Sequence, residues 1–143
     1  MAFNQNMAAT FARQPRHGLA QVANADASGQ KTVVTAGASG SKVTALYASS
    51  TDTSARVVAV SIVRSATTYL LASPTVALRS GDTADTPAVD LLNSTVFPTG
   101  LLSTDNDGQK YLFLESGDTL VVNAQTTVTS AKIVSVHADY SDF

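Results

Sequence analysis

Short runs in which valine, leucine and alanine alternate with serine and threonine fill most of this chain. Such alternation has the two-residue period of a strand with one buried face, and no stretch shows a convincing helical period. The run 56–64 (RVVAVSIVR) is apolar at most positions, which indicates a strand in the centre of a sheet. Strands are expected over residues 31–35, 42–49, 56–64, 67–71, 75–78, 88–92, 110–114, 119–123 and 132–140.

This set of short strands, separated by turn residues, predicts an all-β fold: an antiparallel β-sandwich, jelly-roll-like in its strand count. A closed barrel and an immunoglobulin-like sandwich are the alternatives. Three strands have faces that can be assigned from the alternation. The residues expected to share a face are Val43, Ala45 and Tyr47; Val58, Val60 and Ile62; and Val134, Val136 and Ala138, the last set opposite Ile133, Ser135 and His137.

The 143 residues suit one domain, and a chain of this size buries about two-thirds of its unfolded surface, so a core forms without covalent cross-links. The absence of Cys excludes disulfides, thiolate zinc sites and thiol nucleophiles. The net charge is −2 with 14% charged residues, which disfavours nucleic-acid binding. No apolar run is long enough to span a membrane, and residues 1–18 do not have the pattern of a secretion signal.

Residues 1–30 differ in composition from the rest, being rich in Ala, Asn and Gln and following neither strand nor helix period. They are interpreted as a flexible or extended N-terminal arm, and residues 31–143 as the β-sandwich domain. A disordered leader is the alternative; as an arm, the segment would order against a partner surface. The candidate partner-binding residues are the apolar anchors Phe3, Met7, Phe11 and Leu19, together with Arg13 and Arg16, which can pair with acidic groups.

Two loop motifs have a chemical as well as a structural interpretation. The tetrapeptide SGDT occurs at 80–83 and 116–119, and the second copy is expected to form a hairpin between the strands at Tyr111 and Val121. The segment 103–108 (STDNDG) resembles the front of a calcium loop. Leu114 occupies the place of the bidentate Glu, so a plain turn is favoured and no metal is expected.

Catalytic residues are sparse in this composition. His137 and Asp139 lie two apart on the last expected strand, but no nucleophile elbow accompanies them. Six aspartates fall in loops, where they are interpreted as turn residues: Asp52, Asp82, Asp85, Asp105, Asp107 and Asp118. The four tyrosines fall in expected strands, where packing is favoured: Tyr47, Tyr69, Tyr111 and Tyr140. We therefore expect no enzyme activity and no cofactor.

Three stretches together carry a family resemblance: 37–50 (GASGSKVTALYASS), 55–73 (ARVVAVSIVRSATTYLLAS) and 111–143, in which SGDTLVV is followed by a TSAK strand. Together they are similar to capsid decoration (cement) proteins, or minor head structural proteins, of tailed bacteriophages. The resemblance covers about residues 35–143.

The resemblance implies a β-sandwich that binds the outer surface of an icosahedral capsid and stabilises it. It implies the major capsid protein as partner, self-association as a homotrimer, and a location on the virion surface after synthesis in the host cytoplasm. It transfers no catalytic residues. The alternative is a tail- or fibre-associated β-sandwich module that recognises a cell-surface glycan through the loops 80–86 and 93–108, and a small hydrolase using loop aspartates is the least favoured interpretation.

Overall fold

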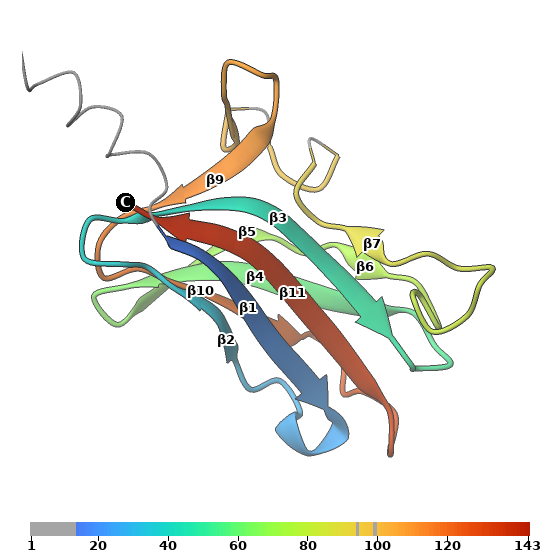
Figure 1. Cartoon of the computed structure of the whole chain (residues 1–143). Helices are drawn as coiled ribbons and strands as arrows, with labels where there is room; N and C mark the ends of the chain where they lie inside the picture. The colour runs from blue at the N-terminus through green and yellow to red at the C-terminus, as the bar shows by residue number, and fades with distance from the viewer. Residues whose placement is uncertain (1–13, 94, 99) are drawn as a thin grey trace, which may run out of the picture.

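The computed structural model describes residues 14–93, 95–98 and 100–143, and within them the chain forms two antiparallel sheets packed as a sandwich (Figure 1). The first sheet has the order β1 (Gln14–Ala23), β11 (Ile133–Asp142), β3 (Ser41–Ser50), β9 (Lys110–Leu114) and β8 (Ser103–Thr104), with β7 (Val89–Asp90) on β3. The second has the order β2 (Lys31–Thr35), β10 (Thr119–Ala124), β4 (Arg56–Arg64) and β5 (Thr67–Ala72), with β6 (Thr75–Val76) on β4. A single-turn 3-10 helix, η1 (Asn24–Asp26), joins β1 to β2.

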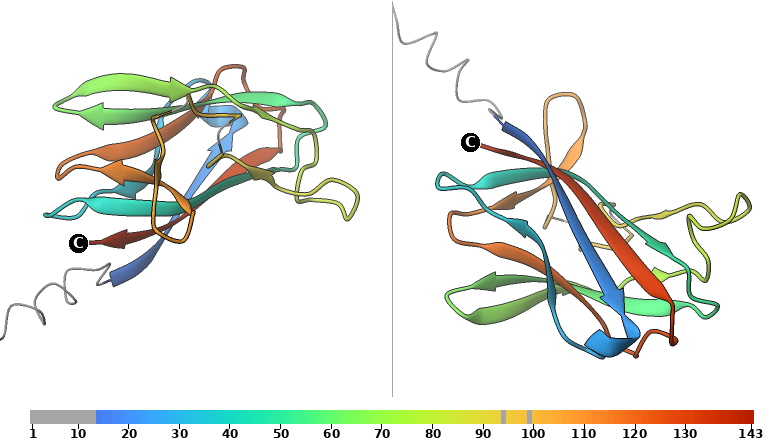
Figure 2. Two further views of the ribbon diagram at one scale, coloured as in Figure 1. Left: turned by 90° about the horizontal axis from the view of Figure 1, so that it is seen from above. Right: turned by 60° about the horizontal axis from the view of Figure 1, so that its bottom comes forward.

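The longer strands are wound in a jelly-roll order. They form the rows β1-β11-β3-β9 and β2-β10-β4-β5, so the chain repeatedly crosses between the sheets, while β6, β7 and β8 lie in the connection from β5 to β9. Eight strands in two sheets with such crossings define a jelly roll. The expected all-β sandwich is confirmed, and the two separate sheets exclude the closed barrel (Figure 2).

The core lies between the two sheets and is built from the inward residues of the alternating strands. On β11, Val134, Val136 and Ala138 are fully buried, as the alternation predicts. The strand β4 lies between β10 and β5, and Val58 and Val60 on it are fully buried, which confirms its expected central place. In the described part of the chain, no helix has the length and apolar character needed to cross a membrane.

A β-bulge overturns the expected faces of β3. Asp139 of β11 pairs with Ala45 and the next residue, Tyr140, pairs with Val43, so one residue of β3 is left out of register. The extra residue shifts the alternation, and Val43 is buried together with Leu46 rather than with Ala45. As a result the Tyr47 side chain lies on the outer face of the first sheet.

The prediction of a hairpin at the second SGDT copy is also wrong. Strand β9 belongs to the first sheet and β10 to the second, so the turn between them carries the chain across the sandwich. The tight hairpin of the second sheet lies instead between β4 and β5. Its two loop residues, Ser65 and Ala66, have φ of 50° and 63°, the left-handed pair that matches strand twist.

The expected boundary between arm and domain, at residue 30, does not match the structure. Residues 14–23 form β1, which pairs with β11 along its whole length as the first strand of the jelly roll. Alternation did not reveal β1 because its inward positions include the polar Arg16 and the small Gly18, so only Ala20 and Val22 signal a buried face. The two-residue strand β8 was also missed, and residues 1–13 of the expected arm lie outside the described residues.

The edge of the first sheet closes onto the second at Gly18. An ideal Cβ placed on Gly18 would lie 2.2 Å from the carbonyl oxygen of Val33 on β2, nearer than real Cβ contacts approach. Glycine is therefore required for the backbones of β1 and β2 to meet.

Replacing this glycine tests the closure. We expect Gly18→Ala to lower the free energy of unfolding by about 1–3 kcal/mol, because the methyl group forces β1 away from β2. Chemical denaturation measures the change. Leu19→Ala, at the neighbouring exposed position, is the control and should change stability by less than about 0.5 kcal/mol; equal effects would contradict the closure.

Candidate functional site

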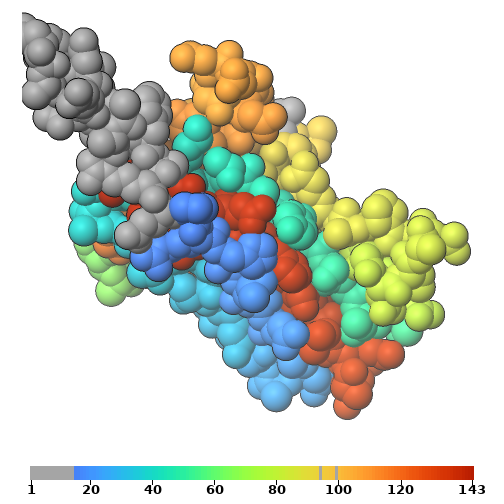
Figure 3. Space-filling model, in the orientation of Figure 1, coloured from blue at the N-terminus to red at the C-terminus, as the bar shows by residue number. Residues whose placement is uncertain are grey.

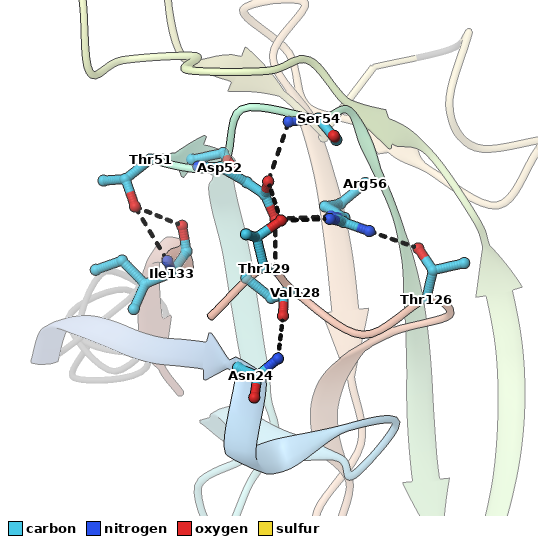
Figure 4. Close-up of polar contacts among 10 residues, drawn as sticks. Asn24, Thr51, Asp52, Ser54, Arg56, Thr126, Val128, Thr129 and Ile133 are labelled. Atoms are coloured by element: carbon cyan, nitrogen blue, oxygen red, sulfur yellow. Dashed lines mark hydrogen bonds and ion pairs between the residues drawn. The ribbon is translucent and has the colours of Figure 1, made fainter. Parts of the chain in front are cut away.

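The most elaborate polar cluster surrounds Asp52, in the loop that crosses from β3 to β4 (Figure 4). Its fully buried carboxylate accepts hydrogen bonds from the Arg56 Nε at 2.7 Å and from the Thr129 backbone N–H at 2.9 Å. The Thr129 hydroxyl donates to it at 2.8 Å and the Ser54 N–H at 3.0 Å. Arg56 Nη2 also donates to the Thr129 hydroxyl at 2.8 Å, which closes the network.

These contacts make Asp52 a structural residue. Burial disfavours its charged form, but the hydrogen bonds from Arg56, Thr129 and Ser54 outweigh burial and hold the pKa of Asp52 well below its usual range. Both carboxylate oxygens already accept protein donors. A carboxylate with so low a pKa and so many partners is a poor general base, so this cluster does not support hydrolysis.

Asp118 has the same role at the crossing from β9 to β10. It is fully buried and receives two parallel hydrogen bonds from Arg64, Nε to Oδ1 and Nη2 to Oδ2, each 2.7 Å long. The N–H of Glu115 donates to it at 2.9 Å and closes the turn. The bonds from Arg64 lower the pKa of Asp118 although burial opposes them. The interpretation of Asp52 and Asp118 as ordinary turn residues missed this, because sequence does not show that these two side chains are buried within otherwise mostly exposed loops.

The Asp52 network predicts a loss of stability in acid. Since the pKa of Asp52 is lower in the folded chain than its ordinary value of about 3.9, the unfolded state takes up the proton first as the pH falls. The stabilisation is therefore complete above about pH 5 and is lost progressively below it. We expect Asp52→Asn to lower the free energy of unfolding by about 1.5–3 kcal/mol at pH 7 and to flatten its decline in acid.

Urea denaturation from about pH 3 to about pH 7 measures both effects, because this range includes the ordinary carboxylate pKa values and extends to neutral pH. Asp85→Asn, in an exposed loop, is the matched control and should leave the pH profile unchanged. A profile for Asp52→Asn that runs parallel to the original would show that Asp52 does not contribute to the acid sensitivity.

The pair His137 and Asp139 does not form a catalytic dyad. Asp139 is instead 2.5 Å from Nδ1 of His17 on the neighbouring strand β1. The His137 ring stacks on Tyr47, with centroids 5.4 Å apart and planes 13° from parallel. Among the described residues no three His, Asp or Glu side chains gather closely enough to hold a metal ion.

The segment 103–108 consists of the short strand β8 and the turn that follows it. Asp105 accepts the N–H groups of Asp107 and Gln109 at 3.1 and 2.9 Å, and its carboxylate lies 3.3 Å from Lys42 Nζ. The backbone bond from Gln109 is the largest cause of the lowered pKa of Asp105. These contacts use the carboxylate that a calcium ion would need, in agreement with the favoured turn.

Two of the six candidate partner-binding residues lie in the described part of the chain, both on β1. Leu19 is 61% exposed on the outer face of the first sheet, the face that Figure 3 presents with β1, β11 and β3 side by side. Arg16 Nε lies 2.6 Å from Asp142 of the same chain, so this cation contacts its own domain. The other four, Phe3, Met7, Phe11 and Arg13, lie outside the described residues, and the partner role of all six stays a prediction.

Two apolar surfaces were missed at the sequence level because strand alternation does not say which edge stays uncovered. One is the β5 edge, where Tyr69 and Leu70 are 54% and 61% exposed. Tyr69 also lines a hollow of about 370 Å³, together with Ile62, Arg64 and Leu71. The exposure of Tyr69 is contrary to its expected packing. The other, which we call the β9 hollow, has a volume of about 500 Å³. It is lined by Lys42, Thr104, Asp105, Asn106, Tyr111, Phe113 and Phe143.

Comparison with protein-family models, curated proteins and solved structures found no match to this chain. The site is therefore interpreted from its own geometry. The glycan-binding alternative uses the loops 80–86 and 93–108, and the segment 103–108 at the end of the second loop lies apart from the loop 80–86 in the views of Figures 1 and 2.

Proposed function

We propose that this protein is a non-enzymatic virion structural protein that binds the outer surface of an icosahedral capsid and stabilises it, as a decoration or cement protein does. The single observation that carries most weight is the uncovered apolar edge at β5. The major capsid protein is the proposed partner, with self-association as a homotrimer. The proposed location is the capsid surface, after synthesis in the host cytoplasm, with no contact to nucleic acid or membrane.

The β5 edge supports a protein-contact role because it lacks the usual protection of edge strands. Its sequence, TTYLLA, contains no charged residue and no proline. Within the described residues β5 pairs with β4 on one side and with no strand on the other. Unprotected strands of this kind pair with extended segments of other chains, and the backbone supplies most of the hydrogen bonds.

The hydrogen bonding of the loop carboxylates supports the proposal that the protein is not an enzyme. Asp52 and Asp118 are saturated by hydrogen bonds, and Asp105 is engaged by Lys42 and its own turn.

Binding to a repeating shell does not require a strong single contact. Several small interfaces on one lattice act at high effective concentration, so weak contacts together give firm attachment. The choice of a capsid as the proposed partner rests on the resemblance to phage decoration proteins.

A binding assay with shells of the major capsid protein tests the role of β5. We expect the full chain to co-sediment with the shells saturably and to raise their resistance to heat. Leu70→Lys should weaken binding at least several-fold, because it places a charge in the apolar contact. Ala84→Lys adds the same charge in an exposed loop and is the matched control. Equal binding by both variants would remove β5 from the interface.

Copy number separates this role from the glycan-binding alternative. Quantitative mass spectrometry of purified particles should find this chain in numbers comparable with the major shell protein. A handful of copies per particle would instead favour a tail or fibre component, and complete absence would overturn the virion assignment.

A further inference from the structure

The β9 hollow is an aromatic surface whose walls are fixed by the fold. Phe113 and Phe143 remain 46% and 39% exposed, with ring centroids 5.8 Å apart. The N–H of Phe143 donates to the Gly40 carbonyl at 3.3 Å, which holds the last residue in place. Lys42 Nζ lies 4.5 Å from the centroid of the Tyr111 ring, a cation–π contact. The hollow is thus preformed, and large aromatic side chains gain considerably from being covered.

The N-terminal segment begins its path close to this hollow. Gln14 pairs with Asp142, Asp142 with Ser41, and Ser41 with Leu114, so the start of β1 and the end of β9 lie in one row of the sheet. Three strand spacings separate them by about 14 Å. Figure 1 shows the start of β1, the end of β9 and the C-terminus at the same end of the sandwich.

Residues 1–13 are long enough to cover the hollow from that starting point. An extended chain advances about 3.3 Å per residue, so Phe11 reaches about 10 Å from Gln14, Met7 about 23 Å and Phe3 about 36 Å. Phe143 follows Asp142, the partner of Gln14, and lies within the reach of Phe11. Phe113 and Tyr111 lie within the reach of the other two side chains.

The chemistry of the segment matches the hollow. Residues 1–12 contain no charged side chain, so the segment itself brings no side-chain charge into the hollow, whose own charged groups, Lys42 and Asp105, already pair with each other at 3.3 Å. Phe3, Met7 and Phe11 are separated by three residues each, which allows three separate apolar contacts. A methionine thioether also packs favourably against aromatic rings.

We propose that residues 1–13 of the same chain fold back over the β9 hollow in the free protein. Phe11 packs on Phe143, while Met7 and Phe3 pack near Phe113 and Tyr111. The short connection to β1 gives the segment an effective concentration on the order of millimolar, above that of a second copy in dilute solution. The inference concerns the isolated chain and does not rest on the proposed capsid role.

A tryptophan reporter tests this contact, since the chain contains no Trp. We would place it at the hollow with Phe113→Trp and, as a second reporter, with Phe143→Trp. Acrylamide quenching is compared between the full chain, a chain lacking residues 1–13, and the triple variant Phe3→Ser, Met7→Ser, Phe11→Ser. The control triple variant, Asn4→Ser, Gln5→Ser and Asn6→Ser, changes polar positions of the same segment. A third reporter, Tyr69→Trp on β5, lies outside the hollow.

Quenching at the hollow should rise several-fold on deletion and in the apolar triple variant, with emission moving to longer wavelength. The control triple variant and the β5 reporter should not respond, and the quenching of the full chain should not depend on protein concentration. Equal quenching with and without residues 1–13 at both hollow reporters would overturn the inference. Protection that disappears on dilution would also overturn it, because the occupant would then be a second copy.

Discussion

Aspartate carboxylates hold the segments in which this chain passes from one sheet to the other, and the sandwich depends on them. Asp52 fixes the crossing from β3 to β4 and ties it to the returning chain at Thr129. Asp118 fixes the crossing from β9 to β10. Asp26 closes the turn after β1 through the N–H of Ala23. Jelly-roll winding needs many such crossings, each leaving backbone N–H groups without a strand partner, and a short acceptor side chain satisfies them locally.

The same chemistry explains why aspartates are numerous here without forming an active site. At Asp52 and Asp118 the carboxylate has an arginine partner and backbone donors, which keep it ionised and fully engaged. Breaking such a buried pair leaves an uncompensated charge, so these residues constrain the fold strongly. Because these hydrogen bonds require the ionised carboxylates, the stability of the fold decreases in acid.

Sequence alone predicted the elements with a clear alternating signal and missed those defined by long-range contacts. The limits of β4 and the buried face of β11 followed from valine-rich alternation. Strand β1 did not, because its inward face includes Gly18, whose role becomes visible only beside Val33 of β2. The β3 bulge and the crossing at 115–118 depend on partner strands far away in the chain, which no local pattern encodes. Of the candidate site, Leu19 is exposed on β1 and its partner role stays a prediction, whereas the contact of Arg16 with Asp142 depends on strand pairing, which the sequence does not show.

The two sheets end in edges of opposite character, and this asymmetry bears most directly on function. At β1 the edge carries Pro15, and the chain closes onto β2 at Gly18, which leaves little room for another strand. At β5 the edge is uncharged and exposes Leu70. An isolated sandwich with such an edge tends to pair with other chains, unless a specific partner covers it first. In the proposed role, a repeating surface that offers many such partners would turn this tendency to aggregate into ordered attachment.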